Sequence, residues 1–100
     1  MEKTAVVIQD NGFGEIALYS DDQKAGFMEI SLDKSASLLT VYHTEVEDEY
    51  SGRGFGKLLL EALVTYSRNN HLQVRPLCPF VHAQFKRHEA TYQDIWFKGE

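Results

Sequence analysis

The chain has 100 residues, 43% of them hydrophobic and 25% charged, so it is expected to fold as a single domain spanning residues 1–100. Its formal net charge is −5 and no cluster of basic residues is present, so nucleic acid is not an expected partner. No apolar run approaches the roughly 20 residues of a membrane span, so no membrane association is expected. A lone cysteine, Cys78, excludes an internal disulfide and favours a reducing, cytoplasmic setting.

The first half of the chain has the pattern of strands separated by turns. Apolar or alternating segments end at turn residues, of which Asp10-Asn11-Gly12 is the strongest signal. Strands are therefore expected over residues 5–9, 15–19, 25–32 and 37–46.

The second half changes to helical spacing. Leu59, Leu63 and Tyr66 recur along one side of a helix expected over residues 55–68. A short strand is expected over 72–77, followed by a helix that starts near Pro79 and ends near residue 88. Residues 92–97 form either a last strand or an irregular tail. The predicted fold class is α+β, with two main helices on a mainly antiparallel sheet.

A glycine-rich loop joins the longest strand to the first helix. Glycines can adopt backbone angles closed to other residues, and the free amides of a helix N-terminus attract anions. The Walker pattern fails here because Leu58 follows Lys57, and a dinucleotide fold would place such a loop after its first strand. An acyl-CoA loop and a plain structural turn remain. The residues of the loop are Ser51, Gly52, Arg53, Gly54, Phe55, Gly56 and Lys57.

The loop resembles the Gln/Arg-x-x-Gly-x-Gly/Ala motif of the GNAT acetyltransferase superfamily, with Ser51 where the motif usually has Gln or Arg. Together with segments 43–46, 77–81 and 92–94, it is similar to a small stand-alone GNAT-like family of about this length, which has a Cys-Pro-Phe/Tyr motif. The resemblance implies a reduced GNAT fold and acetyl-CoA as the acetyl donor.

The same resemblance implies where acetyl-CoA binds. The strand before the loop pairs with the pantetheine amides, and the pyrophosphate rests on the amides of Arg53 to Lys57. The segment around Cys78 lies beside that strand and reaches the acyl group. The cofactor-binding residues implied are Thr44, Glu45, Val46, Ser51, Gly52, Arg53, Gly54, Phe55, Gly56, Lys57, Cys78, Phe80 and Val81.

The acceptor side is expected to be open. Larger GNAT enzymes shape it with two helices among their first strands, and no helix is readable between Tyr19 and Ala25. This favours N-acetylation of an exposed amine on a protein or a small polyamine. Two alternatives remain: a non-catalytic module that binds CoA or acyl-CoA, and an interaction protein whose glycine loop is only a turn.

Cys78 is expected at the N-cap of the second helix, close to the thioester. As a nucleophile it would accept the acetyl group and pass it to the amine. As a general acid it would protonate the departing CoA thiolate. The alternative is a buried cysteine that behaves as a small hydrophobic side chain.

A general base must take a proton from the acceptor amine. Glu45 and His43 share one face of their strand, because alternate residues of a strand point the same way. Either is a candidate base, although His43 alternatively bonds within the sheet and Glu45 alternatively faces water. The four histidines and one cysteine show no zinc spacing, so no metal is expected. A monomer or weak dimer is expected.

Overall fold

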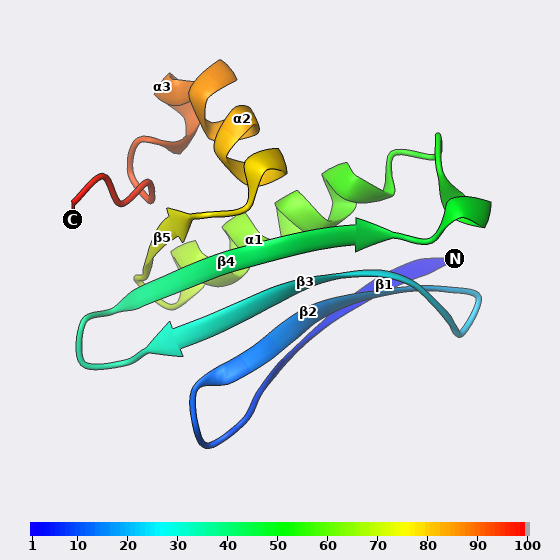
Figure 1. Ribbon diagram of the computed structural model, residues 1–100, viewed down its shortest axis with the longest axis horizontal. Helices are drawn as coiled ribbons and strands as arrows, with labels where there is room; N and C mark the ends of the chain where they lie inside the picture. The colour runs from blue at the N-terminus through cyan, green and yellow to red at the C-terminus, as the bar shows by residue number, and fades with distance from the viewer. Residues whose placement is uncertain (100) are drawn as a thin grey trace.

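The computed structural model describes residues 1–99 and contains one five-stranded sheet in the order β1-β2-β3-β4-β5. The first four strands are antiparallel neighbours in chain order, whereas β5 runs parallel to β4 (Figure 1). The strands are β1 (Glu2–Ile8), β2 (Phe13–Ser20), β3 (Gln23–Asp33), β4 (Leu38–Val46) and β5 (Gln73–Pro76).

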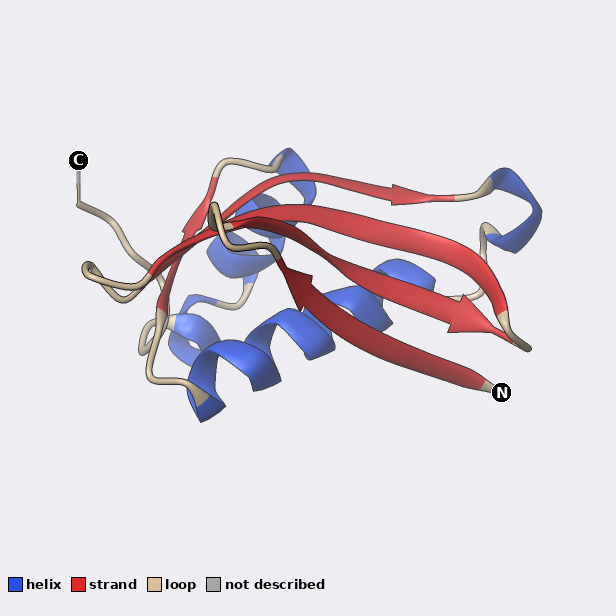
Figure 2. Ribbon diagram, turned by 90° about the horizontal axis from the view of Figure 1, so that it is seen from below, coloured by secondary structure: helices blue, strands red, loops and turns tan. Residues whose placement is uncertain are grey.

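The helices lie after the antiparallel strands in the chain, and α1 runs along one face of the sheet (Figure 2). Val81 and Phe85 of α2 are fully buried in the same core as the apolar side chains of α1. Within residues 1–99 no helix is long and apolar enough to cross a membrane. The helices are η1 (Asp48–Tyr50, a 3₁₀ turn), α1 (Phe55–Asn69), α2 (Pro79–Arg87) and α3 (Glu89–Tyr92).

The predicted α+β class is confirmed, with one parallel strand pair in an otherwise antiparallel sheet. The main helix and the strands agree with the prediction to within three residues at each end. Two short helices, η1 and α3, were not predicted because each has too few residues to show a helical period. Residues 93–97 form no strand, and only Trp96 makes an isolated parallel bridge to Val74.

The two faces of the sheet differ in composition. Side chains on the inner face meet the helices and are almost all fully buried: Ile16, Leu18, Met28, Ile30, Leu39 and Val41. The other face, here called the outer face, carries these exposed or half-buried side chains: Val7, Phe13, Glu15, Phe27, Glu29, Tyr42, His43 and Glu45. Alternation along each strand produces this division.

A β-bulge interrupts the pairing of β3 with β4. Glu29 pairs with His43 and Ile30 with Val41, so Tyr42 is the extra residue. Bulges bend a strand and increase its twist. Here the bend falls where β4 leaves β5, because the pairing of these two strands ends at Val41 and Pro76.

The C-terminal segment is fastened to α1 by Arg68. Its guanidinium donates to both carboxylate oxygens of Asp94, at 3.0 and 3.1 Å, and to the Thr91 carbonyl at 2.7 Å. The bonds from Arg68 lower the pKa of Asp94 below its ordinary value of 3.8. The next residue, Ile95, is buried in the core.

We expect Asp94→Asn to lower the free energy of unfolding near neutral pH by about 1 kcal/mol or less, because both groups are partly exposed. A carboxylate with a lowered pKa stabilises the fold above its unfolded-state pKa, and this contribution is lost as the pH falls through the folded-state pKa. The difference between wild type and variant should therefore shrink below about pH 4. Urea unfolding at neutral and acid pH measures it, with Asp10→Asn as the control. An unchanged difference at acid pH would contradict the prediction.

Candidate functional site

Strands β4 and β5 separate at the centre of the molecule. They pair only over Leu38–Val41 and Gln73–Pro76. Beyond this point β4 continues to Val46, whereas the segment after β5 turns away into α2 (Figure 1). The Cys78 amide donates to the Val41 carbonyl at 2.9 Å and closes the narrow end of the gap. We call this gap the splay.

The splay exposes an unpaired stretch of the β4 edge. The Glu47 amide donates to the carbonyl oxygen of Ala25 at 2.8 Å and so points toward β3. Because backbone groups alternate along a strand, those of Thr44 and Val46 point to the other side, into the splay. No strand pairs with them there, since the β4–β5 ladder has already ended. An extended ligand with amide groups can bond to this edge.

The glycine loop stands beyond the end of β4. Gly52 and Gly54 have φ values of +81° and +76°, a conformation that favours glycine, and Gly54 is the N-cap of α1. A Cβ added at either position would meet no atom within 4 Å. The loop therefore needs glycine for its backbone angles, while the space above it stays open.

The amides of this loop form an anion-binding surface. The first bond of α1 runs from the Leu58 amide to the Gly54 carbonyl, and the amides of residues 52–57 have no acceptor within residues 1–99. No acidic residue lies in the first turn of α1. Free amides and the helix dipole together attract a phosphate or pyrophosphate. The side chains of Arg53 and Lys57 add positive charge at the same end of the helix.

Aromatic contacts hold the loop in place. The ring of Tyr50 stacks on Phe55 at 5.5 Å, and the Arg53 guanidinium lies 5.4 Å from the centre of the Tyr50 ring. The Tyr50 hydroxyl donates to the Gln23 side chain at 3.1 Å. Loss of solvent around the phenol, followed by the nearby Glu49 carboxylate, raises the pKa of Tyr50. Tyr50 thus stays neutral and fixes the loop to the sheet.

Cys78 is the N-cap of α2, as the sequence predicted. It is only 2% exposed, and its sulfur lies 3.2 Å from the Thr44 hydroxyl oxygen, at hydrogen-bond distance. The ring of His82, one turn further along α2, meets the Trp96 ring edge-on at 5.8 Å. The structure therefore brings Cys78 and Thr44 together on the inner side of the splay.

The two residues after Pro79 have different environments. Val81 is fully buried in the core, whereas Phe80 is half-buried and its ring faces the first turn of α1. Phe80 also lines a hollow of about 330 Å³ between α1 and α2, to which Lys57, Gln84 and His88 contribute. Of the pair, Phe80 is the one placed next to the glycine loop.

His43 and Glu45 lie on the outer face, on the other side of the sheet from Cys78 and Thr44. The His43 Nε2 and Glu45 Oε1 atoms are 3.2 Å apart, and the side chains are 55% and 52% exposed. The predicted shared face is confirmed. The ring of Phe27 meets the His43 ring edge-on at 6.2 Å. Acid–base groups thus flank the splay from both faces of the sheet.

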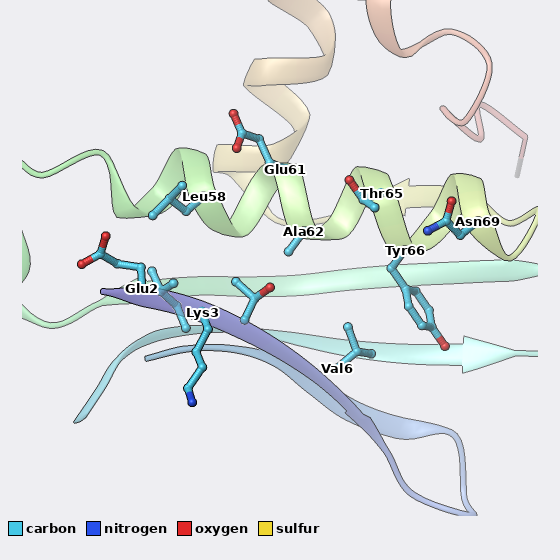
Figure 3. Close-up of a pocket in the computed structure, with 11 residues that line it drawn as sticks. Glu2, Lys3, Val6, Leu58, Glu61, Ala62, Thr65, Tyr66 and Asn69 are labelled. Carbon is cyan, nitrogen blue, oxygen red and sulfur yellow. The ribbon is translucent and has the colours of Figure 1, made fainter. Parts of the chain in front are cut away.

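Other hollows do not contain the predicted site residues. The groove between β1 and α1 has a volume of about 460 Å³ and is lined by residues such as Val6, Leu58 and Tyr66 (Figure 3). None of the predicted catalytic or cofactor-binding residues lines it. In the described part of the chain, no group of three or more His, Cys, Asp or Glu side chains could hold a metal ion.

Two residues at the site were not identified from the sequence. Tyr50 supports the glycine loop, and its position just before the first loop residues was the available signal. Phe27 lies directly opposite Glu45 across the β3–β4 pair. The pairing of Phe27 with Glu45 depends on the register of the two strands. Bulges alter this register, and no local sequence pattern reveals it.

The family is now identifiable. The family model described as GCN5-related N-acetyl-transferase matches residues 15–95, and the chain therefore belongs to that family of acetyltransferases. No sequence among the curated proteins matches the chain significantly.

Solved structures share the fold over nearly the whole chain. A GCN5-like protein from Staphylococcus aureus is 25% identical with a TM-score of 0.66, and the match covers 96% of this chain and 90% of that one. The ribosomal-protein-alanine N-acetyltransferase from Brucella melitensis biovar Abortus 2308 is 14% identical with a TM-score of 0.68, covering 99% and 93%. The Escherichia coli ribosomal-protein-S18-alanine N-acetyltransferase is 13% identical with a TM-score of 0.70, covering 91% and 76%. The last two show the fold alone.

The contact between α1 and α2 generates a test. A Cβ at Gly56 would lie 3.3 Å from the Phe80 ring, tighter than an ordinary contact. Gly→Ala stabilises a helix interior by about 1 kcal/mol, and a smaller gain is expected at Gly56, the second residue of α1. We expect Gly56→Ala to fall short of that gain in the wild-type chain and to recover it in a Phe80→Leu background. Thermal unfolding of the two single variants and the double variant measures the coupling, and strict additivity would show that the ring does not restrain the helix.

Proposed function

We propose that this protein is an acetyl-CoA-dependent N-acetyltransferase that moves an acetyl group to an exposed amine on a protein or a small polyamine. The observation that carries the proposal is the arrangement of the splay and the glycine loop. An unpaired strand edge leads directly to a run of free amides at the N-terminus of α1.

Acetyl-CoA fits this arrangement in two places. Its pantetheine amides would pair with the backbone of Thr44 and Val46, and its pyrophosphate would rest on the amides of Arg53 to Lys57. Ser51 stands where the superfamily motif has Gln or Arg, so the backbone supplies this contact. The residues proposed to bind the cofactor are Thr44, Glu45, Val46, Ser51, Gly52, Arg53, Gly54, Phe55, Gly56, Lys57, Cys78, Phe80 and Val81.

In the proposed reaction the general base lies on the outer face of the sheet and the general acid on the inner side. Glu45, or His43 beside it, takes a proton from the amine on the outer face, and the amine nitrogen then attacks the thioester carbonyl. The amide of Val46 or of a neighbouring residue donates to the carbonyl oxygen as negative charge develops there. When the carbon–sulfur bond breaks, the Cys78 thiol on the inner side protonates the departing thiolate.

Cys78 also supports a two-step route. Its sulfur would attack the thioester, release the CoA thiolate and carry the acetyl group as a new thioester until the amine displaces it. Both roles require the thioester to come close to the Cys78 sulfur, which is 2% exposed and lies 3.2 Å from the Thr44 hydroxyl oxygen. We further propose that the enzyme works in the cytoplasm as a monomer or weak dimer.

Binding of acetyl-CoA is the first test. We expect calorimetric titration to give micromolar affinity, with ATP and NAD binding more weakly. Gly54→Val should abolish binding, because a β-branched residue resists a positive φ and its side chain would occupy the open space above the loop. Circular dichroism checks that the variant is folded. Unchanged affinity would remove the loop from the site, and binding without turnover on any amine would favour a CoA-binding module.

Cys78→Ala separates the chemical roles of the thiol. As a nucleophile, Cys78 should become labelled when the protein is incubated briefly with radiolabelled acetyl-CoA, and Cys78→Ala should lose both label and turnover. As a general acid, it should give no label, and Cys78→Ala should lower kcat by about 10²-fold or more. Mass spectrometry of the intact protein detects the acetyl group. Full activity in Cys78→Ala would eliminate both roles.

A further inference from the structure

The outer face contains a row of acidic side chains that the proposed reaction does not use in full. Glu15 on β2 pairs directly with Glu29 on β3, and Glu29 pairs directly with His43 on β4. His43 in turn contacts the Glu45 carboxylate, beside the splay. The row therefore runs across the strands and ends at the candidate base. We call it the acidic trough.

Aromatic rings form the two sides of this trough. Phe13 and Tyr42 stack at 6.3 Å on one side, and Tyr42 is held by a bond of 2.8 Å between its hydroxyl and that of Ser31. Phe27 stands on the other side, against His43. Between Phe13 and Phe27 lies a hollow of about 380 Å³, with Glu15 and Glu29 in its lining. Phe13 is more than half exposed.

The trough already holds one alkylammonium group. The Lys24 Nζ lies 2.7 Å from the Glu15 carboxylate and 5.2 Å from the centre of the Phe27 ring. This is the combination of carboxylate and ring that binds an amine cation. Glu29 stands opposite Glu15, and among residues 1–99 no hydrogen bond or ion pair reaches its carboxylate. Lys24 neutralises Glu15, whereas among these residues Glu29 has a free carboxylate that can bind a second cation.

We infer that the acceptor is a linear aliphatic polyamine, held along the acidic trough with one amine at the splay. This inference rests on the proposed function and names its substrate class. Glu29 pairs with His43, so Glu45 lies diagonally across the β3–β4 pair from Glu29. Such diagonal positions are about 7–8 Å apart, a distance that two ammonium groups joined by a short methylene chain can bridge. A distal ammonium binds Glu29, the methylenes lie between the rings of Phe13 and Phe27, and the terminal amine reaches Glu45.

The trough suits a polyamine better than a peptide. Its floor is formed by β2, β3 and β4, whose backbone groups are bonded to one another along the ladders. A peptide laid across these strands would find no backbone partners, and its own amides would lose water without compensation. A polyamine carries only ammonium and methylene groups, which the carboxylates and rings satisfy.

Steady-state kinetics with saturating acetyl-CoA test the inference on the intact protein. We expect spermidine to have a far higher kcat/KM than n-butylamine, which lacks the distal cation, or a short peptide containing one lysine. Glu29→Gln should raise the KM for spermidine about three- to fivefold, with little change in kcat or in the rate with n-butylamine. Added salt should reduce this effect. Glu89→Gln, which removes one carboxylate from α3, is the matched control and should leave the KM unchanged.

Two further measurements separate this inference from the proposed function. Calorimetric titration with acetyl-CoA should be the same in Glu29→Gln and wild type, because Glu29 lies on the opposite face from the glycine loop. Phe27→Leu should raise the KM for spermidine while leaving acetyl-CoA affinity unchanged. If acetyl-CoA binds and amines turn over but the lysine peptide is preferred, or Glu29→Gln has no effect on spermidine, the polyamine assignment is wrong. If acetyl-CoA does not bind, the proposed function itself is wrong, and the polyamine inference that rests on it falls with it.

Discussion

The site depends on a limit to strand pairing. β4 and β5 are bonded as far as Val41 and Pro76, where the Cys78 amide donates to the Val41 carbonyl. Pro76 cannot donate a backbone hydrogen bond, and Pro79 directs the chain into α2. The two prolines and the bulge at Tyr42 therefore hold apart two strands that would otherwise continue to pair. The edge of β4 that remains unpaired is the feature to which the glycine loop, Cys78 and Glu45 are all adjacent.

The sheet also separates two environments that the reaction needs. Its inner face and the N-terminus of α1 supply free amides and positive charge, which suit the phosphates of a nucleotide cofactor. Its outer face supplies carboxylates and rings, which suit a cation. Under the proposed function, a donor and an acceptor of opposite charge approach from opposite sides of the sheet and meet at the splay. Within residues 1–99 no helix precedes Asp48, and under the proposed function this leaves the acceptor side uncovered.

Local patterns were sufficient for much of this picture. Alternation along β4 predicted that His43 and Glu45 share a face, and the proline after Cys78 predicted the N-cap of α2. The glycine loop was recognisable because positive φ values require particular residues. The acidic trough was not predictable in this way. It depends on which residues of β2, β3 and β4 lie opposite one another, and two bulges change that register without a clear trace in the sequence. The contact between Thr44 and Cys78 likewise joins segments 34 positions apart.

The tail after α3 has a further consequence for the architecture. The Val74 amide donates to the Ile95 carbonyl at 2.6 Å, and the Phe97 amide donates to the Val74 carbonyl at 2.9 Å. These bonds occupy the edge of β5 that is not paired with β4, which would otherwise present free backbone groups to another chain. The tail therefore protects a short strand whose other edge is paired with β4. Deleting residues 95–97 would expose the free edge of β5 to pairing with other chains, so we expect such a truncation to promote aggregation.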